Sequence, residues 1–286
     1  MKKILIPTDF SQESQNALEF AVGIAKSTGA ELDIVNFVEP IDESGIRVTG
    51  EVRLDDSSEG DLFTLKLIQK NKERLHDIVS KIEQTGFTVK VDIINSKFSE
   101  GVEDFVHKYN CDCVVIGTTG EENASELFTG NHTEKLIEHL GVPVISVRHK
   151  VKIGSITNVV LGLDIMDKNY KQHALEGIKS IVEALKAKVY LVDVIMPNED
   201  RSKESVKTDL EIIAKEAGFN DFSVEVVENI NKEEGLINYS AQINASMIAT
   251  IAHVSHGFSH IFKHSFSEHL TKDSDIPVLT LNSSNI

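Results

Sequence analysis

The chain repeats its own pattern, and this repeat limits the folds that it can adopt. The Val-Pro-Val sequence at 142–144 returns as Ile-Pro-Val at 276–278, 134 positions later. Asp9 returns as Asp164, 155 positions later, so the first half carries about 21 extra residues. We assign these to an acidic insertion at 40–61. A chain of 286 residues is long enough for two copies of one domain.

The two copies are predicted to form tandem domains, 1–150 and 151–286, that alternate strands with helices. Short apolar runs predict buried strands, and apolar residues spaced three or four apart predict amphipathic helices. This alternation implies parallel sheets covered on both faces, so the fold class is α/β with two doubly wound sheets. In the first domain we expect strands at 3–7, 31–39, 87–94, 112–117 and 142–147, and helices at 12–28, 62–84, 100–109 and between Gly130 and Gly141.

The second domain is predicted to follow the same order. Its strands are expected at 158–163, 188–194, 222–228 and 276–281, with 188–194 equivalent to 32–38 and 222–228 equivalent to 87–93. In the first domain, Ser11 is the expected N-cap of the first helix and Gly29 the residue that ends it.

Composition excludes several classes of partner. The chain is 41% hydrophobic and 26% charged, as in soluble globular proteins, and its net charge of −16 argues against nucleic acid or a membrane surface. No apolar stretch is long enough to span a bilayer, and Asp9 interrupts the N-terminal apolar run too early for a signal peptide. We therefore expect a cytoplasmic protein. Cys111 and Cys113 are expected to be a buried reduced pair, with a CxC redox or metal site as the alternative.

A glycine-bearing loop follows the strand that ends near Gly117. Gly120 comes three residues later, Gly130 ten residues after that, and Asn131 follows directly. Ligands bind at the carboxyl ends of strands in open α/β sheets. Glycines there allow close approach of the backbone, and the first N–H groups of the next helix attract an anion. The sequence thus predicts a phosphate site.

This spacing resembles the nucleotide loop of the universal stress protein family, G-x2-G-x9-G followed by Ser or Thr, and the PTDFS sequence at 7–11 is typical of that family. The resemblance implies Rossmann-like domains of the adenine nucleotide alpha hydrolase-like type and a stress-response or regulatory protein that binds ATP. Asn131 stands where the family has a hydroxyl side chain. The binding residues that the resemblance implies are Pro7, Thr8, Asp9, Val38, Gly117, Thr118, Gly120, Gly130, Asn131, His132 and Thr133.

Asp9 has two interpretations. In the family the equivalent aspartate contacts the adenosine together with the residue that ends the second strand, here Val38. The alternative is that the Asp9 carboxylate caps the first helix, and the two roles can coexist. A carboxylate at this place could also hold Mg²⁺ bridged to phosphates.

The second domain lacks the glycine loop. At the same offset of 134, Gly117 becomes Ile251, Gly120 becomes Val254, and Gly130-Asn131 becomes His264-Ser265. β-branched side chains at these positions would be strained or would block phosphate. We therefore predict one nucleotide site per chain, in the first domain, and a degenerate second domain that serves packing or regulation.

The degenerate loop is rich in histidine. His256, His260 and His264 are four residues apart, so on a helix they would share one face. They could bind zinc or another transition metal, but solvent-facing polar positions are the commoner explanation for such a cluster.

Binding is favoured over catalysis. No nucleophile–base arrangement stands out, and no lysine or arginine lies within the glycine loop to stabilise a transferring phosphoryl group; Lys135 is the nearest. The alternatives to nucleotide binding are a scaffold with a vestigial loop and a slow ATPase. In the resembled family, domains pair through their last strands, here 142–147 and 276–281. This implies an intramolecular pseudo-dimer, and a homodimer of whole chains would be a further step.

Overall fold

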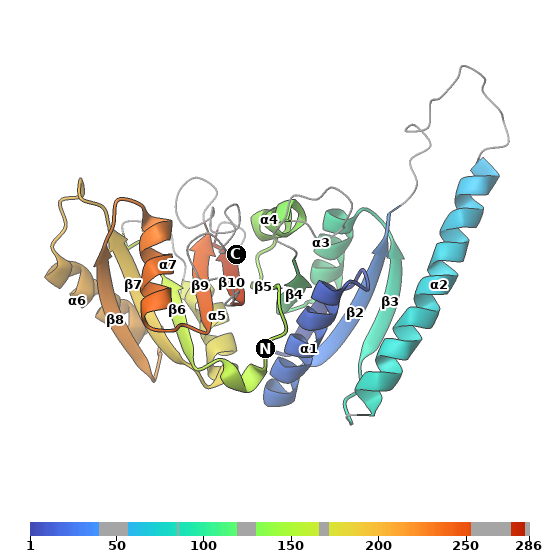
Figure 1. Cartoon of the computed structure of the whole chain (residues 1–286), viewed down its shortest axis with the longest axis horizontal. Coiled ribbons are helices and arrows are strands. Elements are labelled where there is room, and N and C mark those ends of the chain that lie inside the picture. The colour runs from blue at the N-terminus through green and yellow to red at the C-terminus, as the bar shows by residue number, and fades with distance from the viewer. Residues whose placement is uncertain (40–56, 85, 119–129, 166–171, 253–275, 284–286) are drawn as a thin grey trace, which may run out of the picture.

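The computed structural model describes the chain except for residues 40–56, 85, 119–129, 166–171, 253–275 and 284–286, and also leaves aside the side chains at 57–63, 130–132, 172–173 and 252. Within the described residues, ten strands form one sheet in the order β3-β2-β1-β4-β5-β10-β9-β6-β7-β8 (Figure 1). The strands are β1 Lys3–Pro7, β2 Glu31–Val38, β3 Lys90–Asn95, β4 Cys113–Gly117, β5 Val144–Val147, β6 Asn158–Gly162, β7 Lys188–Ile195, β8 Phe222–Glu228, β9 Met247–Ala252 and β10 Val278–Asn282.

Helices cover both faces of this sheet. One core cluster is continuous across both halves, because side chains from α1, α2, α5 and α6 pack on the same face. On the opposite face, α3 and α4 cover a separate core in the first half, and α7 covers another in the second. The predicted α/β class is confirmed. The helices are α1 Gln12–Thr28, α2 Ser57–Glu83, α3 Phe98–Tyr109, α4 Gly130–His139, α5 Gln172–Leu185, α6 Lys203–Glu216 and α7 Lys232–Gln242, with a 3-10 turn η2 at Ile153–Ser155.

Helix α1 has the predicted ends. The Ser11 side chain accepts a hydrogen bond from the Ser14 N–H, so Ser11 is the N-cap. Gly29 has a φ of 75°, and its N–H donates to the Ala25 carbonyl. Glycine adopts this left-handed conformation without a steric penalty, which is why the helix ends there.

Several other predicted boundaries were wrong by a few residues. Helix α2 begins five residues before the predicted 62, and α3 begins two residues before the predicted 100. Strand β3 begins at Lys90 rather than at 87, since its pairing with β2 starts there. Strands β5 and β10 each begin one residue after a proline, Pro143 and Pro277, because proline has no N–H to donate to a neighbouring strand.

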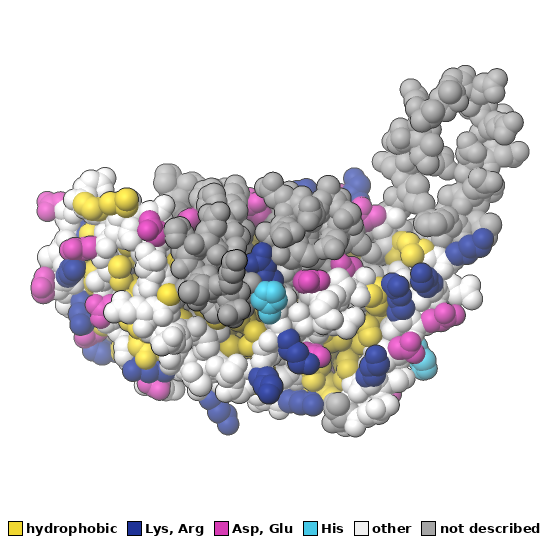
Figure 2. Space-filling view, in the orientation of Figure 1, with side chains coloured by type: hydrophobic (Ala, Val, Ile, Leu, Met, Phe, Trp, Pro, Cys, Tyr) yellow, Lys and Arg dark blue, Asp and Glu magenta, His cyan; other side chains and the backbone are white. Residues whose placement is uncertain are grey.

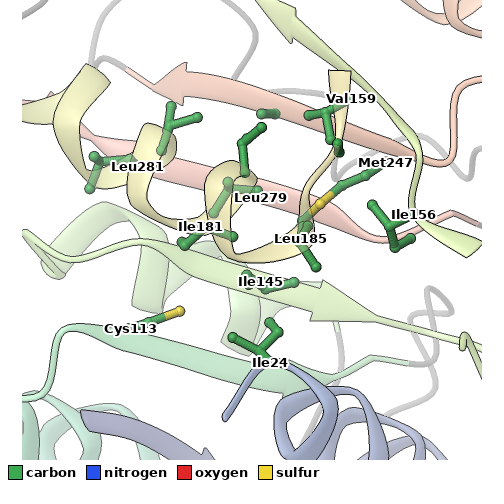
Figure 3. Close-up of a cluster of buried hydrophobic side chains, with 14 of the residues drawn as sticks. Ile24, Cys113, Ile145, Ile156, Val159, Ile181, Leu185, Met247, Leu279 and Leu281 are labelled. Atoms are coloured by element: carbon green, nitrogen blue, oxygen red, sulfur yellow. The ribbon is translucent and has the colours of Figure 1, made fainter. Parts of the chain in front are cut away.

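The two halves join through their last strands, as predicted. Strand β10 runs antiparallel to β5, with Val278 opposite Ser146 and Leu279 opposite Ile145. The other neighbouring pairs of described strands are parallel. Figure 3 shows that Ile145, Leu279 and side chains of α1 and α5 fill one apolar layer at this seam. The pairing covers two apolar edges that would otherwise be open to aggregation. The division at residue 150 stays a prediction.

Strand pairing also tests the predicted equivalences between the halves. Lys3 pairs with Glu31, and Asn158, 155 positions after Lys3, pairs with Lys188. The second strands are therefore offset by 157 positions rather than by the predicted 156. The third strands are offset by 133 rather than 135, because Asp33 pairs with Lys90 and Tyr190 pairs with Ser223. These two alignments were wrong. The second strands shift by one residue, which exchanges the two faces of the strand, and the third strands shift by two, which keeps them; only the ladder fixes such a register.

Within the described part of the chain, no helix is both long enough and apolar enough to cross a membrane.

Leu279→Ala should lower the free energy of unfolding by about 2–5 kcal/mol, because the fully buried side chain would leave a cavity at the seam. Urea unfolding followed by circular dichroism measures this. Ile230→Ala is the control: Ile230 is 79% exposed, and its truncation should change stability by less than about 0.5 kcal/mol. Equal losses for the two variants would contradict a tightly packed seam.

Candidate functional site

The fold brings the predicted site residues to one edge of the first half. Strand β1 lies between β2 and β4. From β1 the chain adds β2 and β3 on one side, and then crosses to add β4 and β5 on the other side. In open α/β sheets, ligands bind at such a reversal of strand order, in a crevice outside the carboxyl ends of the strands. Pro7, Thr8 and Asp9 lie at the end of β1, Val38 at the end of β2, Gly117 and Thr118 at the end of β4, and Thr133 in the first turns of α4.

Part of the predicted glycine loop cannot be placed. Gly120 lies outside the described residues. Gly130, Asn131 and His132 belong to the backbone of the first turn of α4, but their side chains are not described. The ends of β1, β2 and β4 and the start of α4 therefore define the candidate site.

The corner between β1 and α1 is held by hydroxyl and carboxylate groups. Thr8 Oγ1 accepts a hydrogen bond from the Phe10 N–H at 3.1 Å. Asp9 Oδ1 accepts bonds from the N–H of Ser11 at 2.9 Å and from its hydroxyl at 2.6 Å. Asp9 thus supports the capping residue Ser11 and does not cap the helix itself, which corrects one of its two predicted roles.

Two buried amides continue this corner across β2 to α2. Asn36 donates from Nδ2 to the Thr8 carbonyl at 2.7 Å, and Asn71 of α2 donates from Nδ2 to Asn36 Oδ1 at 2.8 Å. Both side chains are buried. Sequence reasoning missed these residues, although a polar Asn36 between the apolar Val35 and Phe37 of β2 was a visible signal.

Gly117 is required by packing inside the protein. A Cβ at this position would lie 2.3 Å from the Glu13 carbonyl carbon and 2.5 Å from the Ser14 nitrogen, both backbone atoms of the first turn of α1. Its φ is not positive either. The positive φ expected of this glycine was therefore wrong, and its small size is required because the end of β4 touches α1 directly. Its close approach to an anion stays a prediction.

Three buried polar atoms in this half have no hydrogen-bond partner. They are Asn71 Oδ1, Ser96 Oγ and Thr133 Oγ1. Asn71 reaches Asn36 near the end of β2, Ser96 follows β3, and Thr133 lies near the start of α4, where it is 1% exposed. Buried polar groups are nearly always paired, since an unpaired one costs about 1–3 kcal/mol. These atoms therefore mark candidate contacts for a polar ligand.

The equivalent edge of the second half is filled by charged side chains. Asp164 is equivalent to Asp9, and by the strand ladders the fully buried Asp193 is equivalent to Asn36. Arg201 donates from Nη1 to Asp193 Oδ2 at 2.8 Å and from Nε to Glu199 Oε2 at 2.8 Å. Lys232, the first residue of α7, lies 2.5 Å from Asp164 Oδ2 and 3.3 Å from Glu199 Oε1.

We call these five residues the rear charge network. Its cations shift the ionisation of Glu199: burial alone would raise the pKa of this carboxyl, but hydrogen bonding to Arg201 and the charge of Lys232 hold the pKa below 4.5. Burial opposes the charge on Arg201 too, yet its bond to Asp193 raises the pKa of the guanidinium. None of the unpaired buried atoms lies in the described part of this half. Sequence reasoning missed the network, because its members come from four separate segments.

The remaining candidates are less informative. His256, His260, His264 and Val254 lie outside the described residues, and within those residues no metal-binding group of His, Cys, Asp or Glu is found. Ile251, which replaces Gly117, is buried in β9.

Cys111 and Cys113 are buried free thiols, as expected. Burial raises the pKa of Cys111 to about 12 and raises that of Cys113 as well, which makes both poor nucleophiles.

Comparison with known proteins identifies the family. The model of the universal stress protein family matches residues 1–148. The chain belongs to this family. One universal stress protein of Methanocaldococcus jannaschii is 31% identical over 159 residues, covering 52% of this chain and 96% of the relative. A second protein from that organism is 27% identical over 151 residues, covering 53% of this chain and 84% of the relative.

The whole fold has a counterpart among solved structures. A universal stress protein from Archaeoglobus fulgidus superposes with a TM-score of 0.71 over 98% of this chain and 96% of its own, at 18% identity. At that identity the likeness establishes the shared fold alone.

Gly117→Ala should destabilise the ligand-free protein by about 1–3 kcal/mol, because the new Cβ would overlap the α1 backbone. Urea unfolding without nucleotide measures this. Gly154→Ala is the matched control, since a Cβ there meets nothing within 4 Å. If both variants were equally stable, the proposed contact between β4 and α1 would be wrong.

Stability should depend on the charge of Glu199. Because its folded pKa lies below the unfolded value of 4.5, its contribution is complete above that pH and is lost as pH falls through the folded value. The stability difference between wild type and Glu199→Gln should therefore shrink as pH falls from about 7 to about 3. Urea unfolding at several pH values tests this. A difference that stays constant would contradict the network.

Proposed function

We propose that this universal stress protein is a stress-response regulator that binds an adenine nucleotide, ATP, in its N-terminal half only. The observation that carries the proposal is the contrast between two equivalent edges. The first half presents unpaired neutral polar atoms at the carboxyl ends of its strands, whereas the second half fills the same place with the rear charge network.

The roles of the binding residues follow from their positions. Asp9 and Val38 end neighbouring strands, so together they can contact the nucleoside. Thr133 Oγ1, buried and unpaired at the start of α4, can donate to a phosphate oxygen. The N–H groups at that helix end favour an anion as well. Pro7, Thr8 and Thr118 shape the crevice, and Gly120, Gly130, Asn131 and His132 complete the glycine loop around the phosphates.

Mg²⁺ fits the same arrangement. Both bonds to Asp9 described above go to Oδ1, and a carboxylate has lone pairs on both oxygens, so Asp9 can also face a cation. A bound Mg²⁺ would neutralise phosphate charge.

We further propose that residues 1–150 form the binding domain and that residues 151–286, paired through β10, serve packing or regulation.

The rear charge network supports a single site. Placing a triphosphate at that edge would bring it against Asp164, Asp193 and Glu199, and removing the carboxylates' cations would leave buried charge unpaired. Arg201 and Lys232 are already bonded to these carboxylates and are not free to hold phosphate.

Asp9→Ala should weaken ATP binding about tenfold or more, because it removes a direct contact and loosens the β1–α1 corner. Asp164→Ala, the equivalent change in the second half, should leave affinity within about twofold. Isothermal titration with ATP and Mg²⁺ measures both, and circular dichroism checks that the variants fold. Equal weakening by the two variants would contradict a single site in the first half. Absence of ATP binding by wild type would favour the scaffold interpretation.

A further inference from the structure

A groove of about 490 Å³ runs along the surface between α1 and α2. Its floor is apolar: Leu18 and Ile82 are each 8% exposed, and Val22 and Ile78 are half-buried beside them. Figure 2 shows hydrophobic side chains gathered between these two helices, with Lys and Arg side chains along α2 and some Asp and Glu side chains among them. This groove is separate from the candidate nucleotide site, since its lining comes from residues 15–22 of α1 and 78–82 of α2 and includes no residue of that site.

Cations on one face of α2 lead along the helix to the groove wall. Lys70, Arg74 and Lys81 lie within about 40° of one another around a helix of 3.6 residues per turn, with one acidic residue, Asp77, on the same face. Lys81 lines the groove, and the Arg74 guanidinium lies 5.1 Å from the centroid of the Phe10 ring. Within the part of the chain that the structure describes, none of these three cations pairs with a carboxylate.

The α1 wall adds little opposing charge. Glu19 lines this wall, but Lys150 neutralises it through an ion pair at 2.7 Å. Over its described side chains, α2 carries five lysines and arginines against three acidic residues, in a chain whose net charge is −16. Unpaired cations beside an apolar floor are thus a local exception on an acidic protein.

We propose that this groove binds an amphipathic helix of a partner protein, with an apolar stripe along one face and Asp or Glu along its flank. Apolar residues at helical spacing would enter the groove between α1 and α2 and cover Val22 and Ile78. Acidic residues beside that stripe would meet Lys70, Arg74 and Lys81, which gives the interaction its orientation and speeds association.

The shape and charge of the groove favour this occupant over two others. A bilayer surface is flat and would not reach a floor that lies between two helices. A second copy of the same groove would bring its own line of cations, so like charges would face each other. A partner helix with carboxylates along its flank fits the concave shape of the groove and complements the cations of α2.

The test uses the full-length protein and a fluorescein-labelled, 18-residue helical peptide with leucines at positions i, i+3, i+4 and i+7 and glutamates on the flank. Fluorescence anisotropy measures its binding. Lys81→Glu should weaken binding about tenfold or more. Lys72→Glu makes the same charge change nine residues away, on the opposite side of α2, and should weaken binding less than about threefold.

A control peptide with lysine in place of each glutamate should bind at least about tenfold more weakly. Failure of the acidic peptide to bind, equal binding of the two peptides, or equal effects of the two variants would overturn the proposal. Two further outcomes would also overturn it. One is preferential sedimentation with vesicles of anionic phospholipid, lost in Lys81→Glu. The other is concentration-dependent self-association of the protein without peptide, lost in the same variant.

Discussion

The antiparallel pairing of β5 with β10 is the constraint on which the rest of this structure depends. Each half alone would end in an apolar edge strand with unpaired backbone groups. Joining the edges satisfies those groups and makes one sheet of the described strands. It also places α1 and α5 on the same face, where their side chains share one continuous core. Close packing follows at the junction: a Cβ on Gly23 of α1 would come within 2.3 Å of the Ile153 side chain.

Within this one sheet, the two halves pair the polar groups at the carboxyl ends of their strands in different ways. The carboxyl ends of parallel strands leave polar groups at an edge that is partly shielded from water. In the first half the groups are neutral, and Asn36 and Asn71 pair with each other while leaving one amide oxygen unpaired. In the second half Asp193 stands at the position of Asn36, and a fully buried carboxylate requires a cation. Arg201 supplies that cation, and Glu199 and Lys232 complete the network.

This difference would give a physical meaning to the degeneracy that we propose for the second half. The second half lacks the three glycines of the loop. It also has the rear charge network, which stabilises the loop after β7 and occupies the place where a ligand would be expected. The described residues of the first half have no such charge network at this edge, and the proposed groove between α1 and α2 adds a second, separate surface to the same half. One domain would then bind both a nucleotide and a partner, while the other supplies its edge strand and a share of the core.

The sequence by itself determined the class of fold and most of the order of elements, and it supplied the residues of the candidate site. Apolar periodicity, the caps Ser11 and Gly29, and the repeat at offsets of 134 and 155 are local or pairwise patterns, so they can be read directly along the chain. The tertiary structure decided what depends on contacts between distant segments. It showed that a side chain at position 117 would overlap the α1 backbone, that Asn71 donates a hydrogen bond to Asn36, and that the register of β7 places Asp193 beside Arg201. No spacing along the chain encodes such contacts, since strand register and helix packing are set by the ladder and the core.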